Sequence, residues 1–254
     1  MGKIAIQLYS VREETSKDFL GTLEKLANMG YQAVQFAGFF NTSATELKSF
    51  MDRVGLSAAG SHMPFETLTG NQLIDSLDYN RTIGNDLIIC PILPEEYRKD
   101  EAAYYRAAEQ LNEIGRVCYE NGFTFAYHNH DIEFEDLGNG KTGFDILFEE
   151  TDQQLVKIEL DCYWASYSAI DPNQIISAYQ DRIVSLHMKD MVIINGKKRS
   201  IELGKGILDI ATLREAGEAA GVSWYVIEQE HFDGAPLEAA KENVTKWSDL
   251  VSST

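Results

Sequence analysis

The chain has 254 residues, 44% of them hydrophobic, which suits one large α/β domain or two small ones. Its 40 acidic and 22 basic residues give a net charge of −18, which argues against binding to nucleic acid or to an anionic membrane. No stretch approaches the ~20 apolar residues that span a bilayer. Three widely spaced cysteines and no secretory signal predict reduced thiols in a cytoplasmic protein.

Eight short apolar segments are predicted as strands, and helical patterns fill most of the gaps between them. In chain order they are residues 4–9, 32–36, 56–61, 86–91, 123–129, 156–161, 183–188 and 224–229. Glycine just past a helix takes the left-handed conformation that ends it. Five glycines in this position, each before a strand, are Gly30, Gly55, Gly84, Gly122 and Gly221. Asp171 and Pro172 predict the start of a later helix.

Repeated strand–helix units predict a parallel sheet with right-handed crossovers. Eight such units in 254 residues match a closed (β/α)8 TIM barrel, and nothing in the chain resembles a linker, so we expect one domain over residues 1–254. A doubly wound open sheet is the alternative architecture. No G-x-G-x-x-G follows the first strand, which counts against a dinucleotide-binding version of that sheet.

Four predicted strands end in residues that bind metals: residues 123–130, 156–161, 183–190 and 224–231. Side chains alternate along a strand, so if Phe123, Phe125 and Tyr127 face the helices, then His128 and His130 face the barrel axis. The same alternation predicts that the following residues also point inward: Glu159, Asp161, Ser185, His187, Lys189, Val226, Glu228 and Glu230. Strand tips of a barrel meet at its C-terminal mouth, where barrel enzymes have their active sites.

A set of carboxylates and imidazoles without cysteine suits one divalent ion such as Mn²⁺, Mg²⁺, Zn²⁺, Co²⁺ or Fe²⁺. Such an ion polarises a sugar carbonyl and stabilises the enediolate that forms when the neighbouring carbon loses its proton. Taken singly, each of these residues could instead be a structural partner in a salt bridge. His62 could contact substrate or cap a turn, and Trp164 could stack on a sugar or pack in the core. Residues 203–206 predict a turn rather than a phosphate loop.

At these residues the chain resembles the xylose-isomerase-like TIM-barrel superfamily, and within it the group of sugar phosphate isomerases and epimerases. The matching segments cover nearly the whole chain in order and are residues 6–12, 127–134, 160–164, 187–190, 203–209 and 227–230. Each segment alone is weak, whereas the ordered set is specific for the superfamily.

The resemblance implies one divalent cation held by Glu, Asp, His and Glu at successive strand ends. Asp161, His187 and Glu228 match three of these positions, and the first falls on Glu133, with His128 as the alternative. The resemblance also implies a catalytic set and a substrate-contacting set. The first comprises His130, Lys189, Glu133 and Glu228; the second comprises His62, His128, Trp164, Glu230, Gln7 and Gln35. Relatives often have an acid at the position of Gln35, whose amide cannot act as a general base.

The leading hypothesis is therefore a metal-dependent sugar isomerase or epimerase that acts on a small-molecule sugar. The same site could instead serve a lyase, dehydratase or hydratase of a keto-sugar or keto-glycoside, because both reactions begin with proton loss beside a carbonyl. An endonuclease is disfavoured by the charge of −18 and by the presence of only 5 histidines. A non-enzymatic sugar- or metal-binding barrel and a homo-oligomeric state stay open.

Overall fold

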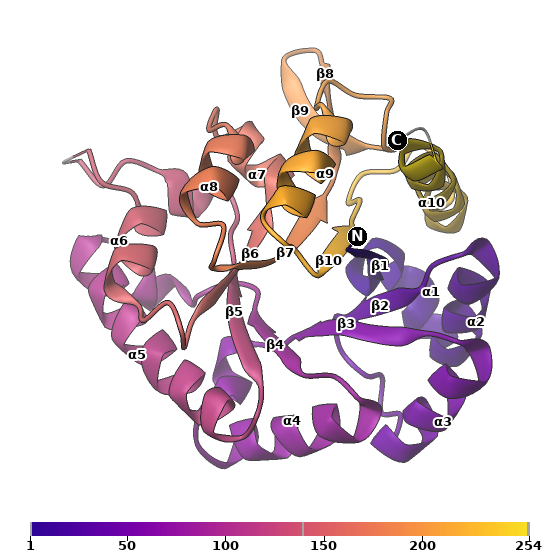
Figure 1. Ribbon diagram of the computed structural model, residues 1–254, viewed down its shortest axis with the longest axis horizontal. Helices are drawn as coiled ribbons and strands as arrows, with labels where there is room; N and C mark the ends of the chain where they lie inside the picture. The colour runs from indigo at the N-terminus through magenta and orange to yellow at the C-terminus, as the bar shows by residue number, and fades with distance from the viewer. Residues whose placement is uncertain (1, 139, 253–254) are drawn as a thin grey trace.

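Eight parallel strands close into a barrel in the order β1-β10-β7-β6-β5-β4-β3-β2, as the sequence predicts (Figure 1). The computed structural model describes residues 2–138 and 140–252. The barrel strands, each overlapping a predicted segment, are β1 Lys3–Gln7, β2 Ala33–Phe36, β3 Ser57–His62, β4 Leu87–Cys90, β5 Thr124–His128, β6 Lys157–Asp161, β7 Ile183–Met188 and β10 Trp224–Ile227. The fold is thus a TIM barrel, with the helices placed around the strands (Figure 1).

The helices return the chain from the end of one strand to the start of the next. They are α1 Arg12–Lys17, α2 Phe19–Met29, α3 Ala44–Val54, α4 Gly70–Ile83, α5 Glu101–Glu120, α6 Gly143–Glu150, α7 Cys162–Tyr167, α8 Pro172–Ala178, α9 Ile210–Ala219 and α10 Pro236–Ser252. Short 3-10 turns are η1 Leu8–Val11, η2 Phe65–Leu68, η3 Glu95–Tyr97 and η4 Ile132–Phe134. All five predicted helix-ending glycines have φ between +73° and +106°, and Asp171 caps α8 with Pro172 at its first position.

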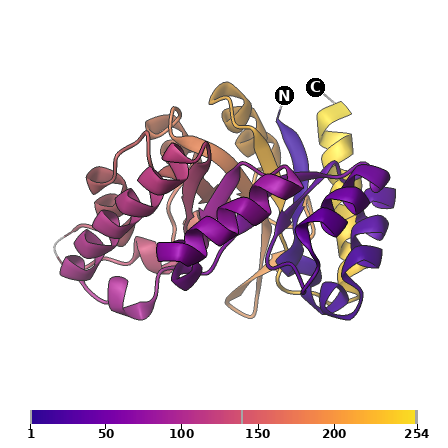
Figure 2. The same ribbon diagram turned by 90° about the horizontal axis from the view of Figure 1, so that it is seen from below.

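A β-hairpin that the sequence analysis did not predict follows β7. Its antiparallel strands are β8 Asp190–Ile194 and β9 Lys197–Ile201, and Figure 2 shows it projecting from the end of the barrel opposite the start of β1. The intervening Asn195 and Gly196 have φ of +51° and +76°. Asn-Gly between apolar runs is a strong hairpin signal, so the sequence does contain the pattern that indicates this element.

The loop after the hairpin is a plain turn, as predicted, and α9 begins at Ile210. The buried carboxylate of Asp190 accepts hydrogen bonds from the backbone amides of Gly204 (2.8 Å), Gly206 (2.9 Å) and Leu208 (3.1 Å). An internal carboxylate therefore satisfies the amides that a phosphate loop would offer to a ligand.

The interior of the barrel has an apolar layer beneath a polar one. Ala5, Ala33, Ala59 and Val226 form the apolar layer, and Trp224 packs against them. Three alanines leave the width that one indole fills, which keeps this part of the barrel dry. Nearer the mouth, the interior is built from buried polar side chains, which include Gln7, Gln35, Glu159, Ser185 and His187.

Cysteine and membrane predictions can be compared with the structure directly. Cys90, Cys118 and Cys162 are all free and buried, and burial raises the pKa of the Cys118 thiol to about 12. Within residues 2–138 and 140–252, no helix is long and apolar enough to cross a membrane. The cytoplasmic location stays a prediction.

One glycine decides which way the end of β3 faces. Pairing between β2 and β3 shifts from Val34–Ala58 to Phe36–Ser61, so β3 contains one extra residue, a β-bulge. Gly60 lies in this bulge with φ of +124°. As a result Ser61 faces α4, where its hydroxyl donates to Asn80, and His62 faces the barrel mouth, where it contacts Glu159.

We expect Gly60→Ala to lower the free energy of unfolding by about 1–3 kcal/mol, since a side chain is strained at this φ. Its Cβ would also lie 2.7 Å from Cδ1 of Ile89. Gly234→Ala is the matched control, because Gly234 is exposed and a Cβ there meets nothing closer than 3.9 Å. Urea denaturation of both variants measures the difference. Equal stabilities would contradict the role of the bulge.

Candidate metal and active site

Four ionisable side chains converge at the C-terminal mouth, from the ends of four adjacent strands. They are His128 on β5, Asp161 on β6, His187 on β7 and Glu228 directly after β10, and their potential ligand atoms lie within 4.8 Å of one another. Asp161 Oδ2 is 3.8 Å from His128 Nε2 and 4.0 Å from His187 Nδ1. Glu228 Oε2 lies 3.0 Å from His187 Nδ1. The structure thus brings Asp161, His187 and Glu228 together, as the strand alternation indicates.

The geometry of this cluster fits a divalent cation. In a tetrahedral site with bonds of about 2.1 Å, ligand atoms lie roughly 3.4 Å apart, within the range seen here. Asp161 Oδ1 accepts a hydrogen bond from the amide of Trp164, whereas the buried Oδ2 has the ammonium of Lys189 as its ionic partner, at 2.9 Å. The same oxygen faces His128 Nε2 and His187 Nδ1, so a cation bound between these three atoms would give the buried carboxylate a further partner of opposite charge. The donor set suits Zn²⁺, Mn²⁺, Mg²⁺, Co²⁺ or Fe²⁺.

Lys189 supplies the opposite charge to the carboxylates of this cluster. Its ammonium lies 2.9 Å from Asp161, 2.8 Å from Glu228 and 2.7 Å from Glu230. Burial alone lowers the pKa of Lys189, but the three carboxylates outweigh it and hold the pKa well above its ordinary value. The side chain is 1% exposed and its ammonium is held by these carboxylates, while the direct catalytic role expected from the sequence stays a prediction.

Glu133, the first choice for the fourth metal ligand, lies outside the cluster. The turn η4 folds its carboxylate away from the mouth, where one oxygen accepts from the hydroxyl of Tyr127 (2.8 Å) and the other from the amide of His130 (2.7 Å). Burial raises the pKa of Glu133. One oxygen is thus bonded to β5 and the other to the loop that follows it, so Glu133 supports this loop, and His128, the alternative, occupies the fourth position of the cluster.

Gln7 and Gln35 lie beneath the mouth rather than in it. Both are fully buried; Gln7 donates to the side-chain oxygen of Gln35 (2.7 Å), and Gln35 donates to Glu159 (2.6 Å). These contacts contradict the expectation that the two amides contact substrate. Glu159 is the residue that the ligand and substrate predictions missed, although the strand alternation correctly placed it inward.

A cavity of about 430 Å³ opens at the mouth beside the cluster. Five predicted site residues line it, namely His62, His128, His130, Glu228 and Glu230, together with Tyr9, Ala37, Gly38, Pro64, Pro91 and Ile92. Trp164 stands next to the lining, 5.8 Å from His130 between ring centroids. His130 Nδ1 and Trp164 Nε1 are buried without a hydrogen-bond partner in the described part of the chain. Within the described residues, both nitrogens are therefore unpartnered polar atoms beside the cavity, covered by the surrounding protein.

His231 belongs to the hairpin rather than to the mouth. Its amide and that of Glu230 both donate to the hydroxyl of Ser200 on β9, each at 3.0 Å. Although His231 ends an apolar run as the other histidines do, the hairpin holds it apart from the cluster. The hairpin thereby fixes the segment that presents Glu230 to Lys189.

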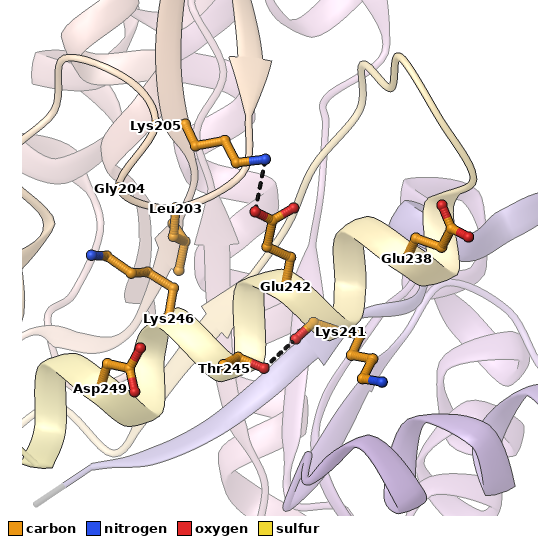
Figure 3. Close-up of a pocket in the computed structure, with 9 residues that line it drawn as sticks. All are labelled: Leu203, Gly204, Lys205, Glu238, Lys241, Glu242, Thr245, Lys246 and Asp249. Carbon is orange, nitrogen blue, oxygen red and sulfur yellow. Dashed lines mark hydrogen bonds and ion pairs between the residues drawn. The ribbon is translucent and has the colours of Figure 1, made fainter.

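A second hollow of about 540 Å³ lies between α10 and the loop after β9 (Figure 3). Lysines and acids alternate along its walls, and Lys205 pairs with Glu242 at 2.7 Å across it (Figure 3). None of the predicted site residues belongs to its lining. We interpret it as a solvated surface groove.

Burial and neighbouring charges give the histidines of the mouth different protonation states. Burial, with help from His187, lowers the pKa of His128 to about 3, and burial likewise lowers that of His130 to about 3. For His187, burial favours the neutral form, but Glu159 and Glu228 outweigh it and raise the pKa to about 10. At neutral pH, His130 is therefore a neutral base in the cavity wall, whereas His187 carries a proton.

The chain belongs to the xylose isomerase-like TIM barrel family, whose model matches residues 23–249. An inosose dehydratase of Clostridium beijerinckii is 24% identical over 215 residues, which cover 74% of this chain and 70% of that protein. A sugar phosphate isomerase/epimerase from Parabacteroides distasonis has a TM-score of 0.81 at 23% identity, with 96% and 93% of the two chains covered. A zinc-containing IOLI protein has a TM-score of 0.74 at 14% identity, over 99% and 98%. The structural likenesses establish the shared fold.

If the cluster binds a cation through His187 Nδ1, the ring must first release a proton, because its pKa of about 10 keeps it protonated below that pH. Affinity for Zn²⁺ should then rise roughly tenfold per pH unit from about pH 6 to pH 9, with about one proton released per ion. Calorimetric titration at several pH values, in buffers of different ionisation enthalpy, measures both quantities. A flat affinity profile without proton release would exclude His187 as a ligand.

Proposed function

We propose that this protein is a divalent-metal-dependent enzyme that moves a proton on a carbon next to the carbonyl of a sugar, as an isomerase or epimerase. The single observation behind the proposal is that the cluster of His128, Asp161, His187 and Glu228 opens onto the same cavity as the neutral imidazole of His130. Cation and base would thus act on adjacent atoms of one bound molecule.

Each group has a distinct part in this proposal. The cation would polarise the sugar carbonyl as a Lewis acid. His130, whose ring lines the cavity, is the proposed acceptor of the proton from the neighbouring carbon. Trp164, next to His130, would offer an aromatic face to the sugar. Lys189 keeps the carboxylates ionised: burial favours protonation of Glu228, but Lys189 and His187 hold its pKa well below the ordinary value.

A dehydratase is the second candidate, because the curated relative from Clostridium beijerinckii is named inosose dehydratase. Both reactions start with loss of the same proton and differ in its fate. An isomerase or epimerase returns a proton to carbon, whereas a dehydratase protonates a departing hydroxyl group. Glu230 lines the cavity with a carboxyl group that is 25% exposed, so in the second candidate it would relay that proton between solvent and the departing hydroxyl group.

The substrate is expected to be an unphosphorylated sugar. Among the residues of the described chain that line the cavity, there are two carboxylates and neither lysine nor arginine. Lys189, the nearby cation, is already paired with three carboxylates. A phosphate dianion would be repelled here, and nucleic acid would be repelled both by this wall and by the net charge of −18.

The proposal is tested by incubating the metal-loaded protein with a panel of ketohexoses and 3-keto-glycosides in D₂O. Deuterium incorporation beside a carbonyl, followed by NMR, reports proton transfer, and a loss of 18 mass units distinguishes dehydration from isomerisation. Asp161→Asn should lower Zn²⁺ affinity at least about 100-fold and abolish exchange, and His130→Ala should lower exchange about 10²–10⁴-fold. Glu242→Gln is the control, since it removes only the exposed ion pair with Lys205.

Full Zn²⁺ affinity in Asp161→Asn would refute the metal site. Tight binding of a sugar by wild-type protein, with no exchange at any carbon, would instead indicate a non-enzymatic binding protein.

Phosphorylation should convert a good substrate into a poor one. We expect kcat/KM to be at least about 100-fold lower for the phosphate ester than for the corresponding free sugar. The reason is that the negatively charged phosphate would lie against a cavity wall of negative charge without a positive partner. Steady-state kinetics with matched pairs measure this ratio. Equal or higher kcat/KM for the phosphate ester would contradict the inference from the cavity lining.

A further inference from the structure

Glu159 lies directly behind the proposed metal site and takes no part in the cavity wall. It is fully buried on β6, two residues before Asp161. One of its oxygens, Oε1, lies 2.7 Å from His62 Nε2, 3.1 Å from His128 Nδ1 and 3.0 Å from His187 Nε2. A single carboxylate oxygen is therefore the common partner of three imidazole rings.

Two of these rings use one nitrogen for Glu159 and present the other to the mouth. His128 contacts Glu159 through Nδ1, and its Nε2 faces Asp161. His187 contacts Glu159 through Nε2, and its Nδ1 faces Glu228 and Asp161. An imidazole held by a carboxylate at one nitrogen is fixed in tautomer and direction at the other.

The second oxygen of Glu159 is held just as firmly. Oε2 accepts from Ser185 Oγ and Gln35 Nε2, each at 2.6 Å. Gln35 is itself held by Gln7 at 2.7 Å and lies 2.8 Å from His187 Nε2. Residues of β2, β3, β5 and β7 thus contact the carboxylate directly, and Gln7 of β1 supports Gln35, so the position of the carboxylate does not depend on a ligand in the mouth.

The group formed by His62, His128, Glu159 and His187 could be considered a second metal site, since its ligand atoms also lie within 4.8 Å of one another. The distances argue against it. Three ring nitrogens lie 2.7, 3.1 and 3.0 Å from the single atom Glu159 Oε1, so they surround that oxygen rather than a point between four ligands. The carboxylate oxygen itself occupies the point on which the three rings converge.

We propose that Glu159 is a positioning residue that orients His128 and His187 so that His128 Nε2 and His187 Nδ1 face Asp161 and Glu228 as one preformed cation site. This inference rests on the proposed function for its metal, but the orientation of the rings belongs to the protein alone. Outer partners of metal-binding histidines typically change metal affinity 10–100-fold when they are mutated.

The orientation can be measured in the metal-free wild-type protein. Long-range ¹H–¹⁵N NMR of protein labelled in its histidines gives the tautomer of each neutral ring, with His128 assigned through His128→Gln. We expect His128 to have its proton on Nδ1, donated to Glu159, with Nε2 free. A proton on Nε2, facing Asp161, would overturn the proposal, and this readout requires no variant at position 159 to fold.

Glu159→Gln tests the consequence for metal binding. Calorimetric titration should show one Zn²⁺ ion per chain in the wild type and a 10–100-fold lower Zn²⁺ affinity in the variant. The preference of His128 for a proton on Nδ1 should also be lost in the variant. Glu133→Gln is the matched control: it alters another fully buried glutamate, which contacts Tyr127 and the amide of His130 but none of the three rings. It should leave both the His128 tautomer and the Zn²⁺ affinity within about twofold of wild type.

Unchanged affinity and tautomer in a folded Glu159→Gln would overturn the inference, as would two Zn²⁺ ions per wild-type chain. Failure of the wild type to bind any divalent ion would refute the proposed function instead, and the His128 tautomer would then decide the role of Glu159 on its own.

Discussion

Buried charge at the barrel mouth is the constraint on which the rest of the structure depends. Isolated charges are too costly to bury, so each must find a partner of opposite sign or a set of hydrogen bonds. Here Lys189 neutralises three carboxylates on one side, and Glu159 contacts three imidazoles on the other. Oδ2 of Asp161 lies between the two halves, 2.9 Å from the Lys189 ammonium and 3.8 Å from His128 Nε2, and it marks the point at which a cation would join the arrangement.

The two halves of this arrangement have different tasks. The half around Lys189 keeps the acids of the cluster ionised and close together despite their mutual repulsion. The half around Glu159 holds the rings of His128 and His187 from behind, through nitrogens that do not face the mouth. A site whose supporting shell is already in place avoids reorganisation when it binds its ion and substrate.

Backbone features far from the chemistry determine whether these side chains meet. The bulge at Gly60 turns His62, rather than Ser61, toward Glu159. The hairpin of β8 and β9 holds the amides of Glu230 and His231 through Ser200, and Asp190 anchors the loop behind it. The family fold is retained at 23% identity to a solved relative, while the proposed reaction depends on a few strand ends, as expected for a barrel that hosts many chemistries.

Local sequence pattern determined the barrel and the inward-facing residues. Strand periodicity, helix-ending glycines and eight repeated units predict the closed sheet, and alternation along β6 and β7 correctly turned Asp161 and His187 inward. Such features follow from local geometry, because a side chain's face is set by its position in its own strand. Tertiary structure alone decided that His128, not Glu133, joins the cluster, and that Gln7 and Gln35 support Glu159 beneath the mouth. Those outcomes depend on register between neighbouring strands and on how the non-periodic turn η4 folds back, which no pattern within a single segment records.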